Sequence, residues 1–224
     1  MEYIDVVIPS AGSGLRMSAS VPKQFALLGD VPVIVRPLRV FKSLPWVRQI
    51  IVVHSAEHRE RMHEVLQDYG LEDCTLVEGG ATRQESVLRG LALVATPRVI
   101  VHNAAVALVT RVEIERVAEI DADCVTTTTP LEVNIVRGED LAEVAVPRKH
   151  LKVINSPQSF RTDVLRECHQ SAAAHGLKFA SETELMLHFK KTVRLVPGPI
   201  TNFKITTALD LMVAQALLGQ MNPV

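Results

Sequence analysis

Near its N-terminus the sequence reads YIDVVIPSAGSGLRM, residues 3–17, where a strand pattern runs directly into a glycine-rich turn. Tyr3 to Ile8 is rich in β-branched and apolar residues, which is typical of a buried strand. The two glycines of the turn allow backbone N–H groups to approach an anion closely. Arg16 and Lys23 then add positive charge. We therefore interpret Pro9 to Gly14 as a loop that holds a polyphosphate at the end of the first strand.

The turn matches neither of the two common phosphate-binding motifs. The dinucleotide fingerprint needs three glycines at the start of a helix, and the P-loop ends on Gly-Lys-Ser or Gly-Lys-Thr. Here Gly14 is followed by Leu15 and Arg16. An ordinary strand-to-loop connection is the alternative interpretation. The polar and basic residues between Ser13 and Lys23, which show no apolar periodicity, favour binding.

The composition points to one cytoplasmic α/β domain. A length of 224 residues suits a single such domain, 1–224. With 24 basic and 25 acidic residues the net charge is -1, so we expect no nucleic-acid or membrane partner and only local anion binding. Cys74, Cys124 and Cys168 lack metal-ligand spacing and are expected to be buried free thiols. Neither a secretory signal nor an apolar run of roughly 20 residues is found.

Strand patterns alternate with helix patterns along most of the chain. Such alternation predicts a mostly parallel, doubly wound sheet with helices on both faces and ligands at the carboxyl ends of its strands. After Pro130 the pattern changes, and residues 131–154 predict a protruding antiparallel arm. The predicted strands are 3–8, 47–54, 75–77, 98–102, 124–128 and 193–196, and the predicted helices are 33–42, 57–69, 83–94, 111–120, 162–174, 181–190 and 209–218.

Three further segments place polar residues near strand ends. Gly79 to Val87 follows a strand and opens a helix, so Gly80 and Ser86 are candidates for contact with a base and a ribose. A plain glycine turn capped by Thr82 is the alternative for this segment. His102 to Ala105 ends another strand. In the segment 202–207, Lys204 lies in a strand-like stretch, which indicates an anionic partner.

Taken together, these motifs resemble the 2-C-methyl-D-erythritol 4-phosphate cytidylyltransferases and the related ribitol-5-phosphate cytidylyltransferases. The resemblance runs from Ile4 to about Leu218. It rests on four ordered motifs: Pro-x-Ala-Gly-x-Gly-x-Arg-Met with Pro22-Lys23-Gln24, the turn Gly79-Gly80-x-x-Arg83-x-x-Ser86-Val87, Ser156-Pro157-Gln158-Ser159-Phe160, and Phe203-Lys204-Ile205-Thr206-Thr207 with Asp210-Leu211.

The resemblance implies a Rossmann-like nucleotidyltransferase that moves CMP from CTP to a polyol phosphate and releases pyrophosphate. It implies Mg²⁺ held mainly by the CTP phosphates, with no protein side chain as metal ligand. It also implies a homodimer formed through residues 131–154. The catalytic positions are Arg16, Lys23, Lys204 and Arg148. The nucleotide positions are Pro9, Ser10, Ala11, Gly12, Ser13, Gly14, Gly80, Arg83 and Ser86, and the acceptor positions are Asn103, Asn134, Ser156 and Ser181.

The chain departs from the family on the acceptor side. The family pattern His-Asp-Ala-x-Arg-Pro is replaced by His102-Asn103-Ala104-Ala105-Val106-Ala107, so an acid and an arginine are missing. The loss of arginine removes a five-donor cation that valine does not replace. Methylerythritol phosphate is the acceptor expected from the family. Ribitol 5-phosphate or another phosphate or phosphonate acceptor, and a degenerate CTP-binding regulatory or interaction module, stay open as alternatives.

Overall fold

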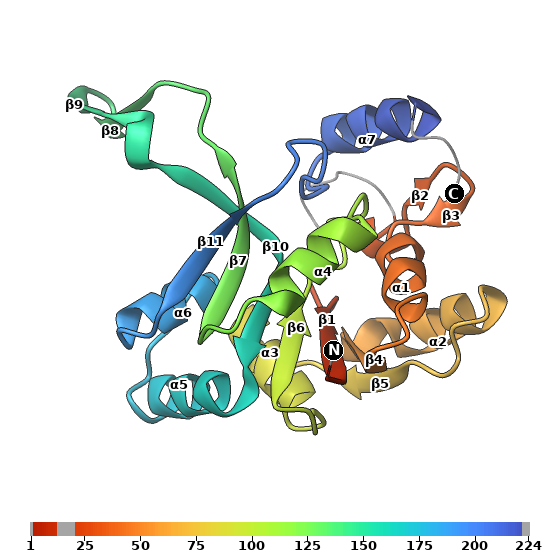
Figure 1. The fold of residues 1–224 in the computed structure, drawn as a ribbon. Coiled ribbons are helices and arrows are strands. Elements are labelled where there is room, and N and C mark those ends of the chain that lie inside the picture. The colour runs from red at the N-terminus through yellow and green to blue at the C-terminus, as the bar shows by residue number, and fades with distance from the viewer. Residues whose placement is uncertain (1, 13–20, 221–224) are drawn as a thin grey trace.

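A single seven-stranded sheet forms the centre of the molecule (Figure 1). The computed structural model describes residues 2–12 and 21–220. Only β10 runs antiparallel to its neighbours in this sheet, so the predicted mostly parallel α/β fold is confirmed. Across the sheet the strands are β11 (Val193–Pro197), β7 (Cys124–Pro130), β10 (Lys152–Arg161), β6 (Arg98–Val101), β1 (Ile4–Pro9), β4 (Val47–His54) and β5 (Thr75–Glu78).

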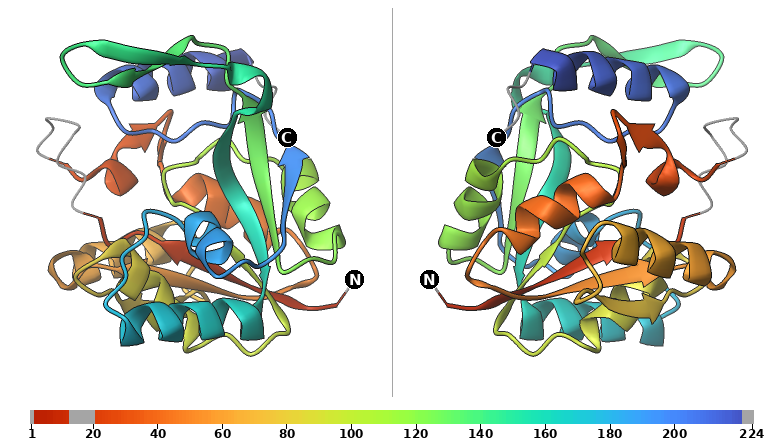
Figure 2. Two further views of the ribbon diagram at one scale, coloured as in Figure 1. Left: turned by 90° about the vertical axis from the view of Figure 1, so that its left-hand side faces the viewer. Right: turned by 90° about the vertical axis from the view of Figure 1, so that its right-hand side faces the viewer.

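Helices cover both faces of the sheet, as the two side views of Figure 2 show. On β1, Val6 and Ile8 pack into the apolar cluster under one helical layer, whereas Val7 packs into the cluster on the opposite face. Both faces of the strand are therefore buried, which is why its sequence is apolar apart from Asp5, whose buried carboxylate pairs with Arg48. The first layer holds α1 (Val35–Lys42), α2 (Arg59–Asp68) and α4 (Arg111–Glu119), and the second α3 (Arg83–Leu91), α5 (Thr162–Ala174) and α6 (Glu182–His188).

Side chains at the helix starts fix where several helices begin. The Thr82 side chain accepts a hydrogen bond from the Glu85 backbone N–H at the start of α3, so the predicted cap is confirmed. Thr110 and Glu113 form a reciprocal capping box on α4. Each cap satisfies backbone N–H groups that have no partner within the helix, which is worth about 1 kcal/mol.

The segment after β7 protrudes from the body, at the upper left of Figure 1. Its strands β8 (Ile135–Gly138) and β9 (Ala142–Val146) pair only with each other, and the short helix η4 (Arg148–His150) follows. The last three residues of the predicted arm, 152–154, begin β10 and pair with 128–130 of β7. We call residues 131–151 the arm from here on.

The remaining short elements and the last helix lie above the sheet in Figure 1. A third apolar cluster joins this region to the body: Leu28, Val33, Ile205 and Ala214 share it with three residues that follow β6, namely Ala105, Ala107 and Leu108. The elements are η2 (Lys23–Phe25), β2 (Leu27–Leu28), β3 (Val31–Pro32) and α7 (Ala208–Gln220), while η3 (Ala56–His58) precedes α2.

Two sequence-based expectations about secondary structure were wrong. We expected no main-sheet strand between the arm and α5, but β10 fills this place. Its pairing with β7 is irregular between Ile154 and Gln158, where Pro157 cannot donate a ladder hydrogen bond, so the strand pattern is broken locally. Lys204 lies in an irregular segment between β11 and α7 and not in a strand.

The expectation for the three cysteines agrees with the structure. The three cysteines are free and buried, and burial raises the pKa of Cys74 and Cys124 to about 12, so these thiols stay protonated. Within residues 2–12 and 21–220, no cluster of three His, Cys, Asp or Glu side chains has the geometry of a metal site. None of the helices described here has the length and apolar character that crossing a bilayer requires.

Candidate functional site

A pocket of about 440 Å³ opens at the carboxyl ends of β1 and β6. It is the position at which open α/β sheets bind ligands. The residues after β1 form one wall of it, and the backbone N–H of Ser10 is anchored to the carbonyl of Val53 at 2.8 Å. Of the predicted nucleotide positions, those in the described residues all line this pocket: Pro9, Ser10, Ala11, Gly12, Gly80, Arg83 and Ser86.

Close packing holds the second predicted nucleotide loop, at Gly79 and Gly80, against the first, at Pro9 to Gly12. A Cβ atom on Gly79 would lie 2.7 Å from both the Ala11 Cβ and the Ser86 Oγ, so only glycine allows this approach. The Ser86 hydroxyl accepts from the Gly80 N–H at 3.2 Å and donates to the Thr82 carbonyl at 2.9 Å. Ser86 therefore shapes the loop in addition to lining the pocket.

Among the described residues, three cationic side chains line the pocket. Lys23 comes from η2, Arg83 from the start of α3, and Lys204 from the segment before α7. The structure thus brings together cationic side chains from three separate parts of the chain, which suits an anionic ligand, although Arg83 is also paired with Glu182. Arg16, Ser13 and Gly14, which were also predicted here, lie outside the described residues.

Asn103, which lines the pocket, contacts Ser156, and we call this pair the Asn103–Ser156 corner. The Asn103 backbone N–H donates to the Ser156 Oγ at 3.2 Å. Asn202 continues this polar chain, since its Nδ2 donates to the Ser156 carbonyl at 3.3 Å and to the Glu113 Oε1 at 2.7 Å. The two predicted acceptor positions Asn103 and Ser156 are therefore in direct contact.

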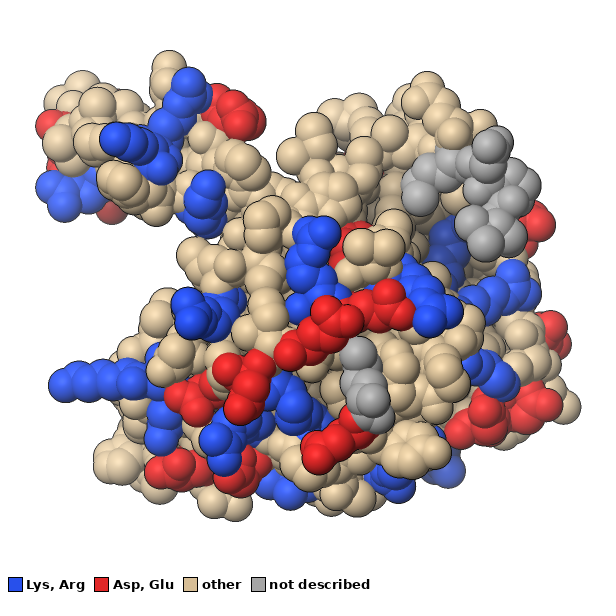
Figure 3. Space-filling view, viewed as in Figure 1, with Lys and Arg blue, Asp and Glu red and all other residues tan. Residues whose placement is uncertain are grey.

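The other predicted acceptor-side residues lie away from the pocket of this chain. Asn134 and Arg148 are exposed on the arm, and the Arg148 guanidinium donates to the Glu132 carbonyl. Figure 3 shows Lys and Arg side chains gathered on the arm, with an open gap between it and the top of the body. Ser181 caps α6 by accepting from the Glu184 N–H at 3.2 Å.

Two residues that support the pocket were not predicted from the sequence. Gln24 is buried and its Nε2 donates to the Ser10 carbonyl at 3.3 Å, which fixes the first nucleotide loop. Glu182 is buried beside Arg83, at 2.7 Å from its Nη1. An acidic residue directly after a helix cap is common for electrostatic reasons alone, so its pattern gave no signal of a partner elsewhere.

A buried histidine, His102, stabilises the loop that carries Asn103. The His102 Nε2 lies 2.8 Å from the Val106 carbonyl, and burial lowers the pKa of His102 to about 4. The imidazole is therefore neutral at neutral pH and donates this hydrogen bond from Nε2. Val106, where the family pattern has arginine, is fully buried and brings no cation to the site.

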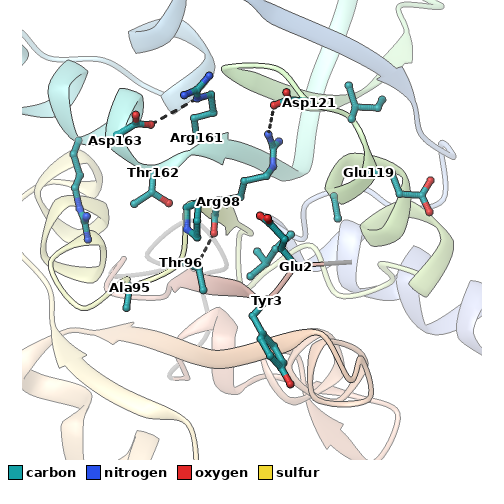
Figure 4. A pocket seen from close by; sticks show the side chains of 15 residues that line it. Glu2, Tyr3, Ala95, Thr96, Arg98, Glu119, Asp121, Arg161, Thr162 and Asp163 are labelled. Atoms are coloured by element: carbon teal, nitrogen blue, oxygen red, sulfur yellow. Dashed lines mark hydrogen bonds and ion pairs between the residues drawn. The ribbon is translucent and has the colours of Figure 1, made fainter.

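A second pocket, of about 950 Å³, lies at the opposite end of the strands (Figure 4). Its arginines are already engaged by protein groups. Arg98 contacts Asp121 at 3.3 Å, Arg161 contacts Asp163 at 3.8 Å, and Arg166 donates to the Leu91 carbonyl. The pocket at the carboxyl ends is therefore the better anion site.

Comparison with known proteins agrees with this geometry. The sequence model of the family described as IspD, 2-C-methyl-D-erythritol 4-phosphate cytidylyltransferase, matches residues 4–220. The chain belongs to the IspD family. The matched range includes both nucleotide loops, the arm, and the segment of Lys204.

Relatives within the IspD family align over nearly the whole chain. The 2-C-methyl-D-erythritol 4-phosphate cytidylyltransferase of Halalkalibacterium halodurans is 35% identical over 226 residues, with 98% of each chain covered. That of Bacillus velezensis is also 35% identical, covering 97% of this chain and 96% of the relative. The crystal structure of the Thermus thermophilus enzyme of the same name matches with a TM-score of 0.79 at 30% identity, over 97% of this chain and 98% of that one.

Proposed function

We propose that this IspD-family chain is a cytidylyltransferase that transfers CMP from CTP to 2-C-methyl-D-erythritol 4-phosphate and releases pyrophosphate. The observation that carries the proposal is the pocket at the carboxyl ends of β1 and β6. It joins two nucleotide loops, three cations and the Asn103–Ser156 corner in a chain that is 35% identical to enzymes of this name.

The pocket suits an in-line displacement at phosphorus. An oxygen of the acceptor phosphate attacks the α-phosphorus of CTP, the new P–O bond forms, and the bond to the pyrophosphate oxygen breaks. Since two anions meet in this step, catalysis depends on positioning and charge neutralisation. Lys23 and Lys204 supply positive charge within the described pocket. We assign Lys23 to the triphosphate of CTP, and Lys204 to the space between the phosphates of CTP and the phosphate of the acceptor.

Magnesium fits this pocket only through the nucleotide. The described side chains that line it include no carboxylate, so they offer no hard anionic ligand for the ion. We therefore propose that Mg²⁺ is held by phosphate oxygens of CTP. When bound, it would neutralise charge on the triphosphate.

The homodimer and the cytoplasmic location remain predictions. The arm exposes apolar side chains, among them Val133, Val136 and Leu141. A hairpin of this size cannot cover its own apolar face, and such a face indicates a contact with another surface. We propose that a second copy of the chain covers it and receives Arg148 at its acceptor phosphate.

A different acceptor is the second candidate, favoured by Asn103 and Val106. Relative to the family pattern, one acid and one arginine are lost, so the net charge of this loop is unchanged while its hydrogen-bonding groups differ. Ribitol 5-phosphate or a phosphonate would remain within the same reaction type.

A panel assay tests the proposal. Pyrophosphate release should be measured with CTP, Mg²⁺ and each of methylerythritol phosphate, ribitol 5-phosphate, other polyol phosphates and phosphonates. We expect turnover with methylerythritol phosphate, and we expect Lys23→Ala to lower kcat at least about a hundredfold because a charge acting on the reacting phosphate is lost. Lys178→Ala, at an exposed lysine outside the pocket, is the control.

Each outcome of the panel decides between the candidates. Preferential turnover of another acceptor would favour the second candidate. Tight CTP binding without pyrophosphate release from any acceptor would contradict the enzyme and leave a CTP-binding module.

A further inference from the structure

Glu182 is a charged residue in an environment that disfavours charge. It is the first residue of α6 and only 2% exposed. Its Oε1 lies 2.7 Å from the Arg83 Nη1, while its Oε2 has no hydrogen-bond partner within the described residues. Burying an ion pair seldom adds net stability, because desolvation offsets the attraction. Stability alone therefore does not account for this buried pair.

Arg83 needs Glu182 because of its place on a helix. It is the first residue of α3, where the helix dipole disfavours a cation. Glu182 stands at the first residue of α6, where the same effect favours an anion. The carboxylate therefore stabilises the guanidinium at a position that α3 alone would disfavour.

Arg83 in turn determines which way the Asn103 amide faces. The Arg83 Nη2 lies 3.3 Å from the Asn103 Oδ1. Guanidinium nitrogens only donate, so the amide oxygen must face Arg83 and the amide nitrogen must face away. The Asn103 Nδ2 accordingly lies on the side of Ser156, 3.5 Å from its Oγ.

This arrangement gives the Asn103–Ser156 corner a neutral donor. The charges of Arg83 and Glu182 cancel, and Asn103 carries no charge. A phosphorylated polyol entering here meets an N–H group and no unpaired carboxylate, so its dianionic phosphate is not repelled.

We propose that Glu182 is a positioning residue for the acceptor: through Arg83 it fixes the Asn103 amide so that Nδ2 donates to an oxygen of the polyol phosphate. The inference rests on the proposed function and adds the group that orients the second substrate. Glu182 itself touches neither substrate.

Steady-state kinetics of Glu182→Gln tests the role. We expect the KM for the polyol phosphate to rise about tenfold, as for the loss of one well-oriented hydrogen bond, with the KM for CTP changed less than about twofold. Asp5→Asn is the matched control. Asp5 is a fully buried carboxylate at 2.6 Å from Arg48, at the amino-terminal side of β1, far from the pocket lining.

A double-mutant cycle separates positioning from general loss of structure. Asn103→Ala should raise the acceptor KM by itself, and adding Glu182→Gln should raise it no further, since both changes act through the same amide. Additive effects, equal rises in the two KM values, or the same kinetics for Glu182→Gln and Asp5→Asn would overturn the inference. A wild-type protein that uses no acceptor of the panel would overturn both proposals, whereas an active wild type with these contrary variant results would overturn only the positioning role.

Discussion

His102 shows how one buried side chain supports the pocket. It is fully buried after β6, contacts Phe41 edge-on at 5.3 Å between ring centroids, and bonds the Val106 carbonyl. Burial lowers its pKa to about 4 from an ordinary 6.5. The neutral ring closes the turn that places Asn103 at the pocket. Protonation of His102 would therefore lower the stability of the fold and disturb the turn that carries Asn103.

The pKa of His102 predicts acid destabilisation. Between pH 6.5 and 4 the unfolded chain binds a proton that the folded chain excludes, so stability falls as the pH falls through this window. For His102 alone the loss from about pH 7.5 to about pH 5 should be on the order of 2 kcal/mol. Urea denaturation at both pH values measures it. His102→Gln should be less stable overall but show a smaller pH dependence, whereas His175→Gln, at an exposed histidine, should retain the wild-type dependence. Equal pH dependence in all three proteins would contradict the assignment.

At the scale of elements, the start of α7 secures the segment that carries Lys204. The Asp210 Oδ2 accepts from the Thr206 N–H at 2.8 Å, the Thr206 hydroxyl at 2.7 Å and the Thr207 N–H at 2.8 Å. These bonds, with the Thr206 hydroxyl first, lower the pKa of Asp210 to about 2. The contribution of this carboxylate is present above its ordinary pKa of 3.8 and is lost as the pH falls through 2. The cap is therefore intact at neutral pH.

Loss of this cap should loosen the Lys204 segment without unfolding the protein. We expect Asp210→Ala to speed hydrogen exchange in residues 203–212 and to lower kcat about tenfold, because Lys204 would be less well positioned. Exchange measured by mass spectrometry, together with kinetics, tests this. Asp210→Asn keeps one acceptor oxygen and should show a smaller effect. Unchanged exchange in residues 203–212 of Asp210→Ala would show that the cap does not control the segment.

At the scale of the whole molecule, the arm and α7 both expose apolar side chains that this chain does not cover. The arm follows the carboxyl end of β7, α7 is reached from that of β11, and both lie at the top of Figure 1. On α7, Leu209 and Met212 are each 65% exposed. Apolar side chains on two elements at the same end of the molecule are typical of a subunit interface.

Sedimentation velocity at micromolar concentration tests the homodimer. We expect a dimer for the wild type and a shift to monomer for Val136→Glu, because a charge would be buried in the contact. Val112→Glu is the control, since Val112 on α4 is 60% exposed and Val136 is 59% exposed. A wild-type monomer would contradict the dimer and leave Arg148 without a role in a partner subunit.

Local pattern in the sequence was sufficient for most elements. The predicted strand 47–54 and helix 162–174 agree with β4 and α5 to the residue, since apolar periodicity and caps act between near neighbours. The strand β10 was missed because Pro157 and the polar residues beside it interrupt the pattern. Its place between β6 and β7 depends on distant partners, which no local pattern contains.

The sequence by itself determined most of the helices and parallel strands, the two glycine-rich loops with Lys23 and Arg83 beside them, and the buried thiols. Only the tertiary structure decided which distant residues meet. Arg83 and Glu182 are 99 positions apart, and Asn103 and Ser156 are 53 apart. The physical reason is that secondary structure follows from spacing within a few residues, whereas these contacts follow from strand order and helix placement, which exist only in the folded chain.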